Sequence, residues 1–152
     1  RPRAGRDRHF VATFEELMGR FEAQQIHLDD LPADPNDNFN NASADGRGFA
    51  VSGGVAQAVV NVIKKEDPTR EVKVVSAQGL AECKKLMQLA AAGKYNGYLL
   101  EGMACPGGCI AGAGTLADPA RSAMMLNKYK AQATMKTAAD TPYKDTLDKL
   151  KY

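Results

Sequence analysis

Residues 71–100 read EVKVVSAQGLAECKKLMQLAAAGKYNGYLL, and this stretch decides the fold class. The segment 71–77 is rich in valine, which is typical of a buried strand. Gly79 and Gly93 bracket a run with apolar residues along one helical face, and a second short apolar run follows at 95–100. The order strand, helix, strand predicts an α/β fold with a mostly parallel sheet flanked by helices.

Helical patterns recur on both sides of this unit. Thr13 and Glu16 have the spacing of a capping box, in which a hydroxyl and a carboxylate bind the free amides of a helix start. Apolar residues then repeat at helical spacing. We expect helices over 14–25, 54–65 and 119–129, and a shorter charged helix over 142–150.

The remaining segments carry weaker signals. Residues 9–12 could end a strand, and residues 29–48, rich in Asp, Asn, Pro, Ala and Gly, are expected to form a long loop. At 152 residues the chain suits a single folding unit. We divide it into an α/β lobe over 1–135 and a C-terminal helical tail over 136–152.

Composition excludes several classes of protein. With 44% apolar and 25% charged residues, the chain is neither disordered nor collagen-like, and no apolar stretch is long enough to span a membrane. A formal net charge of +2 gives no reason to expect nucleic-acid binding. Three cysteines are too few for a disulfide scaffold, so we expect a reducing compartment, the cytoplasm, or metal chemistry.

The residues suited to chemistry gather in 101–114, EGMACPGGCIAGAG. This segment directly follows the second expected strand, and ligands of α/β sheets bind beyond the carboxyl ends of strands. Pro106 is suited to begin a helical turn, which would place Cys105 at a helix N-terminus, where thiolate is favoured. Cys109 follows about one turn later. Glycines such as Gly108 and Gly112 would let a bulky, soft ligand approach the backbone.

Other readings of these residues stay open. A Cys-x-x-x-Cys pair can be incidental, although a thioredoxin-type redox pair is disfavoured because that chemistry uses Cys-x-x-Cys. Met103 could fill the core or contact a ligand. The Ser-Gly-Gly run 52–54 could bind an anion at a helix start, or let helix and sheet pack closely. Cys83 is expected to be a core thiol, and His9 and His27 to lie on the surface.

The number of ligands limits what this segment can hold alone. A [4Fe–4S] cluster takes four cysteine thiolates, and a structural zinc site takes four Cys or His ligands. The motif supplies Cys105 and Cys109, and the whole chain has three cysteines. An iron–sulfur site would therefore need ligands from outside this chain.

Residues 101–114 resemble the third signature of the iron-only, or [FeFe], hydrogenases, E-x-M-A-C-P-G-G-C-x-x-G-G-G-Q-P. Residues 49–60 resemble the G-G-V-x-x-A segment of that family, and residues 13–17 resemble the helix start that precedes it. The similarity covers most of the chain from 10 to 116 and is weaker beyond residue 119.

The resemblance implies a place in the domain that holds the H-cluster, a [4Fe–4S] cubane joined to a two-iron unit. By position, Cys105 corresponds to a cubane ligand and Cys109 to the cysteine whose sulfur joins the two parts. Met103 corresponds to a methionine near the two-iron unit, so Met103 and Cys109 are the residues expected at the reaction site. Gly108 and Gly112 are the glycines expected beside the cofactor.

The same resemblance implies a reaction and its partners. The family interconverts protons and H2 with electrons from ferredoxin, as part of anaerobic metabolism. Its other two signatures, T-S-C-C-P and M-P-C-x-x-K-x-x-E, supply the remaining cysteines and are not in this sequence. Residues 113, 115 and 116 also depart from the pattern.

We therefore expect a C-terminal fragment that needs the remainder of its polypeptide and is inactive alone. Two alternatives are a non-catalytic, hydrogenase-like iron–sulfur carrier or assembly protein, and an α/β interaction module with incidental thiols.

Overall fold

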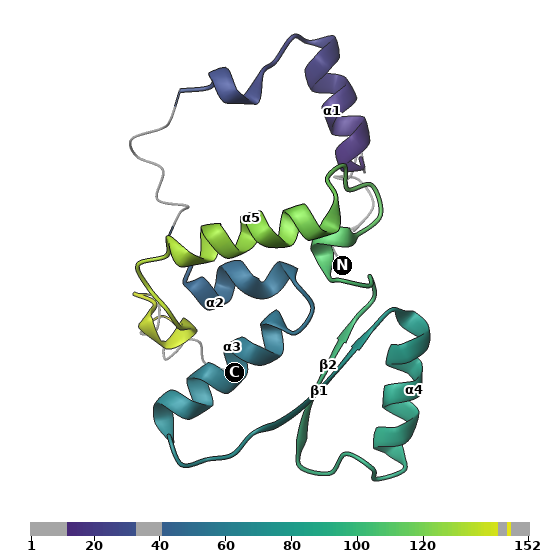
Figure 1. The fold of residues 1–152 in the computed structure, drawn as a ribbon, viewed down its shortest axis with the longest axis vertical. Helices are drawn as coiled ribbons and strands as arrows, with labels where there is room; N and C mark the ends of the chain where they lie inside the picture. Colours follow the sequence, from purple (N-terminus) through teal and green to yellow (C-terminus); the bar gives the residue numbers. More distant parts are fainter. Residues whose placement is uncertain (1–11, 33–40, 143–145, 147–152) are drawn as a thin grey trace, which may run out of the picture.

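A computed structural model describes residues 12–32, 41–142 and 146 (Figure 1). Its helices and strands follow one another as α1 (Phe14–Ala23), α2 (Ala44–Arg47), α3 (Gly54–Glu66), β1 (Lys73–Gln78), α4 (Leu80–Ala91), β2 (Tyr98–Met103) and α5 (Pro119–Ala131). Short 3-10 turns lie at Leu28–Asp30, Gly48–Ala50, Cys109–Ala111 and Ala138–Asp140.

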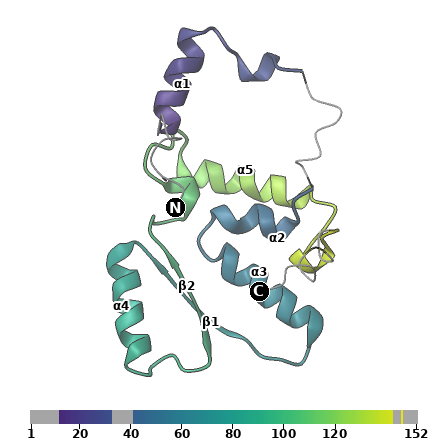
Figure 2. The same cartoon turned by 180° about the vertical axis from the view of Figure 1, so that it is seen from behind.

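The two strands form a parallel pair with α4 as the connection. Their register runs from Lys73 opposite Tyr98 to Gln78 opposite Met103, so both strands end at the same edge. Figures 1 and 2 show α4 on one side of the sheet and α3 on the other. The predicted α/β class, with a parallel sheet flanked by helices, is confirmed.

The strands begin later than their composition predicts. The first was expected over 71–77 and covers Lys73–Gln78, whereas the second was expected over 95–100 and covers Tyr98–Met103. The shift of β2 arises because Tyr95 to Tyr98 form a turn, in which the Tyr98 amide donates to the Tyr95 carbonyl and Gly97 has φ +78°. Glu101 and Met103 consequently belong to the strand itself.

The helix predictions for α1, α3, α4 and α5 are confirmed. At the start of α1, the Thr13 hydroxyl accepts from the Glu16 amide at 3.2 Å and the Glu16 carboxylate accepts from the Thr13 amide at 2.7 Å. This is the predicted capping box. Asp118 caps α5 by accepting from the Arg121 amide at 2.9 Å.

The prediction of one long loop over 29–48 is wrong at its C-terminal end. Ser43 caps the short helix α2 by accepting from the Gly46 amide at 3.1 Å, and the Gly48–Ala50 turn follows directly. Of the strand expected over 9–12, residues 9–11 lie outside the described part, as does nearly all of the helix expected over 142–150.

The segment after residue 118 packs back onto α2 and α3, with α5 beside α2 in both views (Figures 1 and 2). The Arg47 guanidinium lies 4.0 Å from the centre of the Tyr129 ring and donates to the Tyr129 carbonyl at 2.7 Å. The amide of Ala44 donates to the Met135 carbonyl at 2.8 Å. An ion pair joins Lys65 of α3 to Asp140. The division into units at residue 135 stays a prediction.

The core of the described residues is thin. Six apolar residues are buried and none is completely enclosed; they are Ala56, Ala58, Val60, Ala77, Leu86 and Ala133. Large apolar side chains of α1 and α5 remain exposed, among them Phe14 at 63% and Met125 at 55%. No helix in the described ranges is long and apolar enough to cross a membrane.

The start of α3 provides a test of this packing. A Cβ atom at Gly54 would overlap the carbonyl oxygen of Gly48, whereas a Cβ at Gly19 in α1 would meet nothing within 4 Å. We expect Gly54→Ala to lower the free energy of unfolding by about 3 kcal/mol or more, because backbone has to move. Gly19→Ala should raise it by up to about 1 kcal/mol. Denaturant unfolding measures both, and equal effects would contradict the packing described.

The Lys65–Asp140 pair makes a second prediction. The hydrogen bond from Lys65, with further bonds from Thr137, holds the pKa of Asp140 well below its ordinary value of 3.8. Because its pKa is lowered in the folded state, Asp140 stabilises the fold at pH values above 3.8. This stabilisation decreases as the pH falls from 3.8 toward the lower pKa of the folded state. The difference in unfolding free energy between the chain and Asp140→Asn should therefore be larger at pH 7 than at pH 3. An equal difference at both values would contradict the pair.

Candidate functional site

The cysteine-bearing loop, residues 104–114, begins where β2 ends. Its first feature is a tight turn in which the Gly108 amide donates to the Cys105 carbonyl at 3.0 Å, with Gly107 at φ +89°. A positive φ at the third position with Pro106 at the second is the pattern of a type II turn. The predicted helical turn at Pro106 is therefore wrong, and Cys105 does not stand at a helix N-terminus.

Contacts from two other segments hold this turn. The Gln78 side chain, at the end of β1, accepts from the Gly107 amide at 2.7 Å. On the other side, the Ser52 amide donates to the Gly107 carbonyl at 3.2 Å. A Cβ at Gly108 would lie 2.5 Å from the Ala50 carbonyl oxygen, so the two backbones touch at a place where only glycine fits.

Glu101 joins β2 to the start of α3. Its carboxylate accepts from the amides of Gly53 at 2.5 Å, Val55 at 3.1 Å and Ala56 at 3.0 Å, and the residue is 7% exposed. The first amides of a helix have no intrahelical partner, and the helix dipole favours an anion at that end. Glu101 therefore satisfies the N-terminus of α3 from inside the protein.

This contact resolves the two readings of residues 52–54. The helix start does bind an anion, and that anion is the carboxylate of Glu101. The glycines also permit close packing, because Gly54 lies against the backbone of Gly48 and Gly53 has φ +89°. The close backbone contact at Gly54 is with the turn Gly48–Ala50, whereas the predicted reading was close packing of helix on sheet.

The two motif cysteines differ in their surroundings. Cys105 is half-buried, and a Cβ built at Gly112 would lie 3.7 Å from its sulfur, so this thiol faces the backbone at Gly112. Cys109 is exposed and begins the 3-10 turn Cys109–Ala111. The loop thus presents one thiol that is accessible and one that is partly covered.

Cys83 lies on α4, against the carboxyl ends of β1 and β2. Its half-buried thiol is within hydrogen-bonding distance of the Met103 carbonyl at 3.5 Å and the Ala77 carbonyl at 3.7 Å. A Cβ at Gly102 would lie 3.2 Å from its sulfur. The thiol thus packs against the sheet, but Cys83 is half-buried rather than the core thiol that was predicted. His27 is exposed, and His9 lies outside the described residues.

Met103 shares the α3 face of β2 with Glu101, because side chains alternate along a strand. It lines a small cavity of about 250 Å³ together with Val55, Val59 and Glu101. Met103 and Cys109 line different cavities in this structure.

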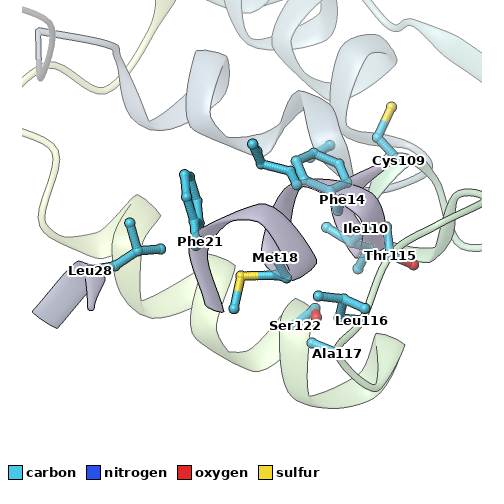
Figure 3. Close-up of a pocket in the computed structure, with 12 residues that line it drawn as sticks. Phe14, Met18, Phe21, Leu28, Cys109, Ile110, Thr115, Leu116, Ala117 and Ser122 are labelled. Carbon is cyan, nitrogen blue, oxygen red and sulfur yellow. The ribbon is translucent and has the colours of Figure 1, made fainter. Parts of the chain in front are cut away.

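An apolar groove of about 640 Å³ lies between α1 and the segment from Cys109 to Ser122. Figure 3 shows Cys109 at one end of this groove and Leu28 at the other, with Phe14 and Phe21 of α1 between them. Almost the whole lining is apolar, and Thr115 and Ser122 are its hydroxyl-bearing residues.

The donor set suits part of a metal cluster. Within residues 12–32, 41–142 and 146, no group of three or more His, Cys, Asp or Glu side chains could hold a metal ion. The loop offers two thiols of the kind that bind iron–sulfur clusters, which take four. The chain therefore matches half of such a ligand set.

Sequence reasoning missed the groups that hold the loop. The sequence pattern predicts Glu101 just after the strand and indicates no role for Gln78, because neither residue is close in sequence to its hydrogen-bond partner. A charged residue between the apolar Leu100 and the apolar Met103 was the available signal. Such a residue in a buried strand requires a polar partner.

Comparison with known protein families identifies a match. A family model described as "Iron only hydrogenase large subunit, C-terminal domain" matches residues 1–113, which include β1, β2 and both motif cysteines. No curated protein matches the chain.

The exposure of the thiols predicts an order of alkylation. Iodoacetamide should modify the exposed Cys109 of the folded chain before the half-buried Cys105 and Cys83. Peptide mass spectrometry at successive times measures this order. In denaturant the three rates should converge, which serves as the control. Modification of Cys83 as fast as Cys109 in the folded chain would contradict the described surroundings.

Proposed function

Because the chain belongs to the family of C-terminal domains of the iron-only hydrogenase large subunit, we propose that it supplies two thiolate ligands to the iron–sulfur centre of such an enzyme. The observation that carries the proposal is the glycine-rich loop at the end of β2, which bears Cys105 and Cys109 and lies within the matched residues. The centre would be the H-cluster, a [4Fe–4S] cubane with a two-iron unit.

Each motif residue receives a role in this proposal. Cys105 would bind the cubane from its half-buried position, and the exposed Cys109 would bind the cubane and share its sulfur with the two-iron unit. Gly112, which faces the Cys105 sulfur, would leave room beside it, and Gly108 would let the loop pack against the backbone of Ala50 and Ser52. Met103 would lie near the two-iron unit, from its position at the carboxyl end of β2.

When bound, the cluster would relay electrons from the donor and provide the iron at which protons and H2 interconvert. The chain's own residues hold and orient its ligands. Gln78 and Ser52 fix the turn that follows Cys105. Cys105 is half-buried, and this burial limits the access of water to its sulfur. The proton-donating cysteine of the family belongs to a signature that this sequence does not contain.

The site is completed by partners. Two thiolates are half of the four that a cubane requires, so the other two come from the remainder of the polypeptide. Ferredoxin would deliver the electrons, and protons and H2 would be the small reactants. The isolated 152-residue chain is accordingly inactive in this proposal.

The test uses the polypeptide that carries this chain together with the other two cysteine signatures. Cys105→Ala and Cys109→Ala should abolish the electron paramagnetic resonance signal of the cubane. Hydrogen evolution should fall by about a hundredfold or more, since changing groups that only orient ligands already costs about 10–100-fold. Cys83→Ser is the matched control, because that thiol lies outside the cysteine loop and its hydrogen bonds run to the strand carbonyls of Ala77 and Met103.

Unchanged iron content in both motif variants would contradict the ligand roles and favour incidental thiols. Hydrogen evolution by the isolated chain would contradict its inactivity. A bound cluster without hydrogen turnover in the unaltered polypeptide would favour the carrier or assembly protein.

A further inference from the structure

Glu101 has a place in the fold that neither ligand chemistry nor the family match explains. It is buried at 7% exposure, and both carboxylate oxygens accept backbone hydrogen bonds at the start of α3. A buried carboxylate is costly unless it is fully hydrogen-bonded, so this arrangement needs all three donors.

The same residue lies on the strand that leads into the cysteine loop. Cys105 follows four residues later, and the turn after it rests against Ser52, which directly precedes the Glu101 donor Gly53. The Glu101 carboxylate thus joins β2 to the start of α3, and the Ser52 amide joins the loop to the residue that precedes this helix start. A shift of either element relative to the other would move Cys105.

We propose that Glu101 is a positioning residue that sets where the Cys105 sulfur lies relative to α3. The inference rests on the proposed function, since the position of the Cys105 sulfur matters only if this sulfur binds the cluster. Glu101 itself does not contact the cluster in this proposal and acts through β2, the loop and the start of α3.

Replacing Glu101 by glutamine removes the negative charge and keeps nearly the same side-chain shape. Its amide has one acceptor oxygen, and its nitrogen only donates, so it cannot accept on both sides as the carboxylate does. An amide nitrogen beside a backbone N–H would push the helix start away from β2. The substitution leaves the length and volume of the side chain nearly unchanged.

The experiment uses the complete cluster-bearing polypeptide and compares Glu101→Gln, Glu101→Asp and the unaltered protein. Glu82→Gln is the matched control, because Glu82 is an exposed carboxylate in the first turn of α4. The readouts are iron retained per chain, the paramagnetic resonance spectrum of the remaining clusters, and the melting temperature.

Glu101→Gln should lower cluster retention by about tenfold or more, as is typical for groups that orient a ligand. The clusters that remain should show a shifted spectrum, because the Cys105 sulfur has moved. Glu101→Asp keeps the charge on a shorter side chain and should shift the spectrum as well. Glu82→Gln should change neither readout.

An unchanged spectrum in whichever Glu101 variants fold, even with a lower melting temperature, would overturn the proposal and leave Glu101 a purely structural residue. The Cys105→Ala variant, measured alongside, separates the two claims. If it retains the cluster, the proposed function fails. If it loses the cluster while the Glu101 variants keep an unaltered spectrum, only the positioning role fails.

Discussion

Three backbone amides at the start of α3 donate to the carboxylate of Glu101, and this contact joins segments that lie 45 to 48 residues apart in the chain. It fixes the helix to the strand that ends in the cysteine loop. Hydrogen bonds to a charged group each contribute about 1.5–3 kcal/mol, which is more than most surface contacts provide. In a chain whose described core has six buried apolar residues, such a contact has unusual weight.

The parts of the fold that follow from local pattern were predictable. The strand–helix–strand unit and the capping box of α1 depend on residues close in sequence, and both are found. The strand boundaries and α2 were not predictable, since α2 is a short turn of small and polar residues held by Ser43 and by contacts with the segment after residue 118. Contacts of this kind produce no periodic pattern of apolar residues from which a helix could be predicted.

In the candidate site, too, the features set by neighbouring residues were predictable and those set by distant contacts were not. The cysteine loop and its place after a strand were evident from sequence, but the type II turn replaced the expected helical turn, because Gly107 adopts φ +89°. The support of the loop by Gln78, and of the start of α3 by Glu101, depends on which side chains the sheet brings together at its edge. The site is therefore better described as a loop held from both sides than as a helix terminus that activates a thiol.

Hydrogen exchange of individual amides, followed by nuclear magnetic resonance in the unaltered chain, tests the Glu101 contact most directly. The amides of Gly53, Val55 and Ala56 should exchange at least about tenfold more slowly than those of Leu80, Ala81 and Glu82, because Gly79 provides α4 with no side-chain cap. Equally fast exchange at both helix starts would contradict the account, since it would mean that Glu101 does not hold α3.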